Sequence, residues 1–109
     1  MSINYGGYEF ESIKLLDSWN PPSYGGIYAI SFKKDPVNKP DTYSILYFGE
    51  TEDFSERGID SSHHKYKCWK YHGYQKNLYV SIHQVYSEDV RKNREQKLIA
   101  SYNPKCNDT

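Results

Sequence analysis

Apolar residues are concentrated in short β-prone runs at residues 26–32, 43–48 and 77–86. In the third run, leucine, valine and isoleucine occupy alternate positions, which is typical of a strand that buries one face. The polar stretch 33–42 contains two prolines and separates the first two runs. Such a stretch is typical of a loop, so the first two runs are predicted to form a β-hairpin.

A long helix is predicted near the C-terminus. Ser87 is followed by two acidic residues and suits an N-cap, and the helix is expected to run to about Tyr102. Pro104 is expected to end it, because the residue before a proline is disfavoured in the α region. Asp53 or Ser55 is expected to begin a short helix after the second strand.

A further helical stretch is predicted within residues 62–73, whereas residues 8–18 fit either a helix or a strand and end at the proline-rich 20–23. Together the elements predict an α+β fold with a small three-stranded antiparallel sheet flanked by helices. A chain of 109 residues suffices for one hydrophobic core, so residues 1–109 are predicted to be a single domain.

Composition and charge narrow the class of protein. No apolar run approaches the ~20 residues of a membrane-spanning helix, and the N-terminus lacks a signal segment, which predicts a soluble protein. Cys68 and Cys106 are the only cysteines, so no disulfide framework is expected and a reducing cytoplasm is the simplest compartment. Residues 1–62 hold 5 Lys or Arg against 10 Asp or Glu, and residues 63–109 hold 9 against 4. This asymmetry fits either a basic face or an unevenly charged solvated surface.

The predicted C-terminal helix places a carboxylate on its inward face, because Glu95 shares that face with Leu98 and Ile99. An inward carboxylate must be paired, hydrogen-bonded or bound to a cation. One interpretation is a structural ion pair with Arg91 or with another arginine, or a position at the edge of the apolar stripe. The other is a cation site.

Tyrosines lie beside glycines in the first two predicted strands, as Gly-Ile-Tyr at 26–28 and Tyr-Phe-Gly at 47–49. Singly, each is more typical of core packing beside a turn glycine. Together they resemble the two motifs of the GIY-YIG nuclease family. Arg57 stands eight residues beyond Gly49, as in that family, and Glu95 and Asn107 look like its metal-binding glutamate and terminal asparagine. The match spans roughly residues 21–108, and its ordered set of elements is more specific than either tripeptide.

Three features depart from the family pattern. The loop between the tripeptides is longer than usual, which a hairpin connection tolerates. The family's histidine or tyrosine usually lies at the position of Ser61, whereas His63 and His64 follow it here. A short insertion favours His63 but leaves both histidines open, and Asn103 competes with Asn107 as the terminal asparagine, although Asn107 is preferred.

The resemblance implies metal-assisted hydrolysis of phosphodiester bonds in DNA, with RNA as an alternative substrate. Glu95 would bind one Mg²⁺ or Mn²⁺, and Arg57 would stabilise charge on the phosphate. Tyr28 would activate the attacking water, with His63 accepting a proton in relay. Tyr47 would brace Tyr28 or contact the phosphate. Structural roles are implied for Gly26, Gly49 and Asn107.

Residues 63–76 alternate basic and aromatic side chains without an acidic residue. The pattern fits a surface that follows phosphates and stacks on bases, and equally an amphipathic helix whose Trp69 faces the core. The residues predicted to contact nucleic acid are His64, Lys65, Lys67 and Lys70. A subsidiary pattern, His64, Cys68 and His72 at helical spacing, is a weak zinc motif because it lacks a fourth ligand.

A second interpretation of function stays open, namely a non-catalytic module on the same fold that binds nucleic acid or protein. Tyr28, Arg57 and Glu95 favour the enzyme, and the displaced histidine favours the module. Because 109 residues leave no room for an attached DNA-binding domain, specificity is expected from substrate structure, from a partner or from a second copy in a homodimer.

Overall fold

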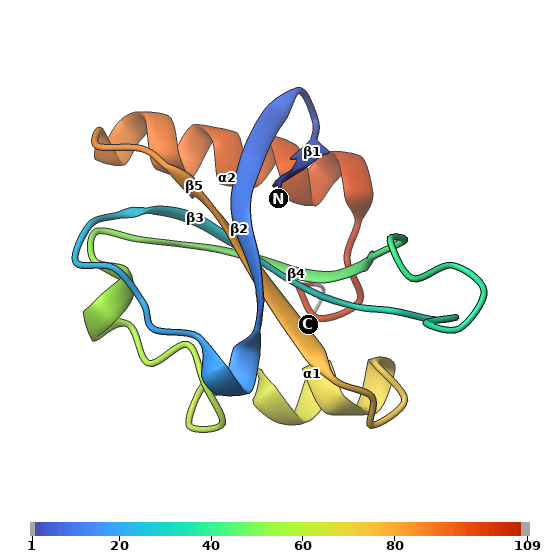
Figure 1. The fold of residues 1–109 in the computed structure, drawn as a ribbon. Helices are drawn as coiled ribbons and strands as arrows, with labels where there is room; N and C mark the ends of the chain where they lie inside the picture. Colours follow the sequence, from blue (N-terminus) through green and yellow to red (C-terminus); the bar gives the residue numbers. More distant parts are fainter. Residues whose placement is uncertain (1, 108–109) are drawn as a thin grey trace.

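The computed structural model describes residues 2–107, which form five strands, two α-helices and two short 3₁₀ helices (Figure 1). The strands are β1 (Ser2–Tyr5), β2 (Tyr8–Leu15), β3 (Gly26–Phe32), β4 (Ser44–Thr51) and β5 (Leu78–Gln84). The helices are η1 (Leu16–Ser18), η2 (Phe54–Glu56), α1 (Tyr66–His72) and α2 (Glu88–Tyr102).

The strands form one curled antiparallel sheet in the order β1-β2-β5-β3-β4 (Figure 1). The predicted three-stranded sheet flanked by helices is therefore wrong. All three predicted strands are present, as β3, β4 and β5, but the β1–β2 hairpin extends the sheet beyond β5. The architecture remains a mixture of helices and antiparallel strands.

Strand β2 comes from the segment whose pattern fitted either a helix or a strand. Phe10 is fully buried, as expected for a strand residue on the core face. The register against β5 then shifts between Glu11 and Lys14, and Ser12 adopts a left-handed φ of 55°. An irregularity of this kind interrupts the alternation of apolar and polar residues, which is why the sequence pattern did not distinguish strand from helix.

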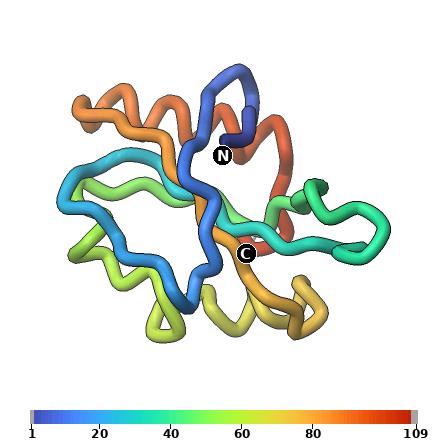
Figure 2. Tube along the Cα trace, viewed as in Figure 1, coloured from blue at the N-terminus to red at the C-terminus, as the bar shows by residue number. Residues whose placement is uncertain are grey.

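The two α-helices cover opposite faces of the sheet (Figures 1 and 2). On one face, Tyr28 of β3 and Phe54 of η2 belong to a buried cluster with Trp69 of α1. On the other face, Leu98 of α2 packs in a second cluster with Phe48 of β4. The loop between β3 and β4 projects beyond the rest of the chain (Figure 2). Tyr28, the tyrosine of the first motif, therefore lies on the face of the sheet that α1 covers.

The predicted C-terminal helix is confirmed as α2, with the Val90 amide donating to the Ser87 hydroxyl at 3.4 Å. The helix ends at Tyr102, and Asn103 follows in the left-handed conformation with φ of 47°. The short helix predicted after the second strand is η2, whose N-cap is Asp53. Within residues 2–107, no helix combines the length and apolar character needed to cross a membrane.

The chain after α2 returns to the edge of the sheet. The Cys106 amide donates to the Leu46 carbonyl of β4 at 3.0 Å. There Cys106 forms a disulfide with Cys68 of α1, with a Cα–Cα distance of 5.8 Å. The expectation of no disulfide is therefore wrong, because the return of the C-terminal segment brings together two cysteines that are 38 residues apart in sequence.

Candidate active site

Both motif glycines make room for close approaches. Tyr28 lies opposite Gly49 in the β3–β4 register, and a Cβ atom on Gly49 would collide with the ring and hydroxyl of Tyr28. A Cβ atom on Gly26 would collide with the backbone carbonyl of His83 on β5. Gly49 therefore allows the Tyr28 side chain to lie across β4, and Gly26 allows β3 to pack closely against β5.

The Tyr28 hydroxyl is hydrogen-bonded to His63, with a distance of 3.0 Å from Oη to Nε2. His63 is buried, with 5% of its surface exposed, whereas the neighbouring His64 is exposed and stacks on the His63 ring at 4.5 Å. Of the two histidines that the sequence left open, the structure brings His63 to Tyr28. The segment Gly58–Ser62 supplies the extra length that carries His63 into this position.

The tautomer of His63 follows from its second hydrogen bond. The Lys65 amide donates to His63 Nδ1 at 3.0 Å, so Nδ1 is an acceptor. Burial, followed by the positive charge of Arg57, lowers the pKa of His63 to about 4, so the ring is neutral at pH 7. A neutral ring that accepts at Nδ1 carries its proton at Nε2. In the resting site His63 therefore donates its Nε2 proton in the hydrogen bond to Tyr28, and its role in a proton relay stays a prediction.

Tyr47 completes an aromatic group around Tyr28. Its ring centroid lies 6.0 Å from that of Tyr28 and 5.6 Å from that of His63. Burial raises the pKa of Tyr28 strongly, and its interaction with Tyr47 raises it further. Burial also raises the pKa of Tyr47, whereas its hydrogen bond with Tyr28 lowers it. Both phenols are therefore protonated at pH 7 in the protein alone.

Arg57 supplies positive charge to this group and lowers the pKa of both Tyr28 and Tyr47. It lies directly after η2 and is the only cation among the described residues that line an open hollow of about 500 Å³, whose other lining residues are Thr51 and the acidic Glu52, Asp53 and Glu56. No ion pair within residues 2–107 engages its guanidinium. Arg57 is therefore available to bind an anion at the open side of the site.

Glu95 of α2 approaches the same group and is half-buried, as expected for a carboxylate on the inward face. Burial, with the nearby charge of Glu50, raises the pKa of Glu95 to about 7, although a hydrogen bond from the Glu50 amide opposes the shift. Its negative charge raises the pKa of Tyr28 and Tyr47, so it acts on both phenols. Five side chains from β3, β4, α2 and the segment between β4 and α1 therefore share one site.

Sequence reasoning missed the role of Glu50. Its carboxylate accepts from Arg91 Nε at 2.9 Å, while Arg91 also donates to the Tyr86 carbonyl at 3.1 Å. The expected alternative, in which Arg91 pairs with Glu95, is therefore wrong. Glu50 directly follows the Tyr-Phe-Gly motif, and an acidic residue at that position is the only sequence signal for this second carboxylate.

Glu95 fits a hard divalent cation in its donor chemistry. It offers carboxylate oxygens, has no ion-pair partner within residues 2–107, and is half-buried. No group of three or more His, Cys, Asp or Glu side chains is arranged for a metal in the described part of the chain. Glu95 would therefore act as a single protein ligand, as Mg²⁺ often requires because it keeps much of its water. The zinc pattern is wrong, since Cys68 is in a disulfide.

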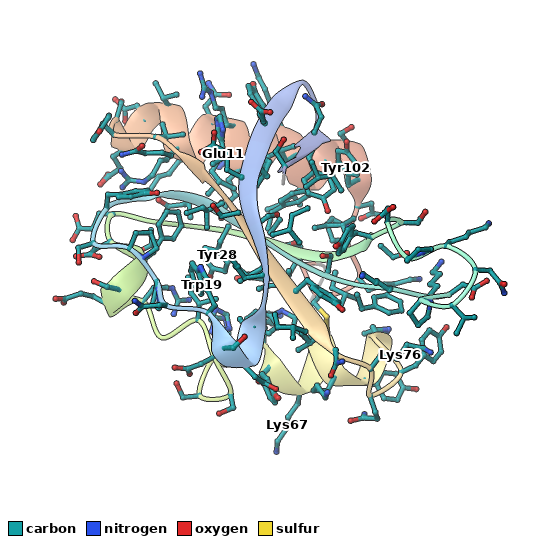
Figure 3. All side chains as sticks on the ribbon, in the orientation of Figure 1. Glu11, Trp19, Tyr28, Lys67, Lys76 and Tyr102 are labelled. Atoms are coloured by element: carbon teal, nitrogen blue, oxygen red, sulfur yellow. A yellow bond between two sulfur atoms is a disulfide. The ribbon has the colours of Figure 1, made fainter. Side chains whose placement is uncertain are left out.

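The basic-aromatic segment contains helix α1 and buries one of its aromatic side chains, while nucleic-acid binding by its basic residues stays a prediction. Trp69 is fully buried, which agrees with the amphipathic alternative. Lys67 is exposed and points away from α1 into solvent (Figure 3). Lys65 is half-buried. Lys70 Nζ donates to the Lys76 carbonyl at 3.0 Å, so its ammonium stabilises the turn after α1.

The two asparagines have different structural roles. The Asn107 side chain accepts from the Phe48 amide and donates to the Phe48 carbonyl, both at 2.8 Å. It therefore pairs with the outer edge of β4 beside Tyr47, as a neighbouring strand would. Asn103 instead terminates α2 in the left-handed conformation. The preference for Asn107 as the bracing residue agrees with this geometry.

Comparisons of the chain with models of protein families, with curated protein sequences and with solved structures found no match. The family resemblance therefore rests on the motifs themselves, and the geometry of the site provides the physical argument about function.

Proposed function

We propose that the chain is a divalent-metal-dependent endonuclease, resembling the GIY-YIG enzymes, that hydrolyses phosphodiester bonds in DNA. The observation that carries the proposal is the meeting of a phenol, a guanidinium and an inward carboxylate at Tyr28, Arg57 and Glu95. These groups come from separate segments and include an arginine and a carboxylate without ion-pair partners within residues 2–107. That combination suits a phosphate and a cation together.

Glu95 would hold Mg²⁺ or Mn²⁺. The bound cation would polarise the phosphate and stabilise charge on the leaving oxygen. Arg57 binds a non-bridging phosphate oxygen through its forked N–H groups and stabilises the charge that develops there. The raised pKa of Glu95 means that cation binding competes with a proton near pH 7.

Tyr28 is the group that directs the attacking water. Its hydroxyl oxygen accepts a hydrogen bond from His63 Nε2–H, and such a bond favours a negatively charged phenol oxygen over a neutral one. Arg57 acts in the same direction. Tyr47 supports Tyr28 through its hydroxyl and ring. His63 is thus a positioning residue that acts through Tyr28.

The test is cleavage of supercoiled plasmid DNA by the purified chain with Mg²⁺ or Mn²⁺. We expect nicked or linear product from the wild type and none from Glu95→Gln, which keeps the size of the side chain but removes its charge. Tyr86→Ala is the matched control, because Tyr86 is 84% exposed and should leave cleavage unchanged. A structured RNA in place of the plasmid tests the alternative substrate.

Equal cleavage by wild type and Glu95→Gln would reject the cation site. Absence of cleavage with both metals, together with specific binding of DNA, would favour the non-catalytic module. The proportion of linear product separates one acting site from two, and sedimentation of the protein–DNA complex would then identify a homodimer. A cytoplasmic location stays part of the proposal, although the Cys68–Cys106 disulfide removes the cysteine argument for a reducing compartment. Thiol labelling of acid-quenched cells tests whether the Cys68–Cys106 bond exists in the cytoplasm.

A further inference from the structure

A cavity of about 370 Å³ opens between strand β2 and the chain that leads from η1 toward β3. It is built by β2, by the segment after η1, and by β5. The motif residues contribute nothing to its lining, so the catalytic proposal does not account for it.

Two aromatic side chains form the wall of the cavity. Trp19 and Tyr24 both line it and both are half-buried. Each packs edge-on against the fully buried Phe54, with ring centroids 6.2 Å and 5.9 Å away. Since both rings rest on one buried side chain, they are held in place before a ligand binds. Flat rings held in this way present stacking surfaces at a low cost in conformational entropy.

The cavity lies within reach of the candidate active site. Phe54 also packs edge-on against Tyr28, with a centroid distance of 6.5 Å. Ile82 lines the cavity and is the cross-strand partner of Tyr28 in the β3–β5 register. With strands about 4.8 Å apart, the cavity is within two strand spacings of Tyr28, roughly 10 Å. Figure 3 shows the Trp19 and Tyr28 side chains in the same region of the molecule.

The remaining lining is mixed, since Pro22 and Ile82 are apolar and the other residues are polar or cationic. Ser12 and Asn20 offer hydrogen-bond donors and acceptors, and Lys14 offers the only charge, because no lining residue is Asp or Glu. Ser12 stands at the β2 irregularity in the left-handed conformation, which is unfavourable for a residue with a side chain and is often found at binding sites. Lys14 follows the irregularity on the exposed side of the strand.

We infer that this cavity binds an unpaired nucleobase of the substrate strand, stacked against Trp19 and Tyr24, with Lys14 on a neighbouring phosphate. The inference rests on the proposed nuclease function and deepens it. Aromatic stacking accepts any base, because every base has a π face, and the polar rim suits base edges. A base inside an intact duplex cannot enter such a cavity. The favoured substrate is therefore DNA with a single-stranded or displaced base beside the cleaved bond.

The test measures binding rather than cleavage, in the Glu95→Gln background without divalent metal. The probes are a labelled oligothymidylate, a blunt duplex, and the same duplex with one unpaired thymine. We expect the probes that contain an unpaired base to bind more tightly and to quench Trp19 emission. Trp69 is fully buried, so its emission should not respond to stacking.

Substitutions then locate the binding site. Trp19→Ala should weaken binding of the unpaired-base probes about tenfold or more, and Trp19→Phe should restore most of it because phenylalanine still stacks. Lys14→Ala should weaken binding and reduce its salt dependence. Tyr86→Ala is the matched control, since Tyr86 is 84% exposed, lies outside the cavity and is not part of the basic-aromatic segment 63–76. Circular dichroism verifies the fold of each variant.

The cavity assignment is overturned if all three probes bind equally, if none binds, or if Trp19→Ala and Tyr86→Ala behave alike. It is also overturned if an apolar peptide binds the cavity without displacing the oligonucleotide, because the oligonucleotide then binds elsewhere. Selective binding of the unpaired-base probes, together with no cleavage by the wild-type protein, would reject the proposed nuclease activity while supporting the cavity as a base-binding site. Cleavage of the blunt duplex and of the duplex with an unpaired thymine at the same rate, with equal affinity, would support the nuclease activity and reject the cavity as a base-binding site.

Discussion

The neutral, buried state of His63 predicts a specific loss of stability in acid. His63 is 5% exposed and packs against Trp69 with a centroid distance of 4.5 Å. Burial and the charge of Arg57 lower its pKa from 6.5 to about 4. The unfolded chain therefore binds a proton at His63 at a higher pH than the folded chain does, so stability is complete above pH 6.5 and falls as the pH decreases toward 4.

The magnitude follows from the two pKa values. The full difference between 6.5 and about 4 corresponds to ~3 kcal/mol of unfolding free energy. At about pH 5 roughly 2 kcal/mol of it is lost relative to about pH 7.5, because the unfolded histidine is almost fully charged there and the folded one is not. Carboxylates titrate in the same range, so the effect of His63 must be isolated as a difference between variants.

The assay is urea denaturation followed by circular dichroism, at about pH 7.5 and about pH 5, for wild type and His63→Gln. Glutamine cannot titrate and keeps an N–H donor toward Tyr28. We expect the variant to lose about 2 kcal/mol less than the wild type on acidification. His72→Gln is the control and should lose as much as the wild type. Equal losses in wild type and His63→Gln would refute the neutral buried state and the donor role assigned from it.

Three further predictions concern the site and its supports. Tyr28→Phe should leave DNA affinity unchanged but slow single-turnover cleavage by about 100-fold or more, and a wild-type rate would exclude the phenol. Asn107→Ala should cost about 2 kcal/mol in urea denaturation, because both polar groups of Phe48 lose a partner. Replacing both cysteines by serine should cost about 3–4 kcal/mol, the value for closing a loop of this length, and an unchanged midpoint would argue against the disulfide in solution.

The sequence by itself determined the local elements. Helix α2 begins and ends where its capping residue Ser87 and Pro104 predict, because both signals act within one helical turn. The strands of the β3–β4 hairpin and β5 follow from runs of apolar residues. The inward position of Glu95 follows from helical periodicity alone. The motif residues were also visible in the sequence, since their order along the chain does not depend on how the chain folds.

The tertiary structure decided how these pieces meet. The β1–β2 hairpin joins β5 through pairing across about 70 residues, and the irregularity at Ser12 hid its strand pattern. The choice of His63, its donor role toward Tyr28 and the pairing of Arg91 with Glu50 depend on contacts between distant segments. Periodicity and capping report only on neighbours within a few residues, whereas burial and charge pairing depend on what the rest of the chain places nearby.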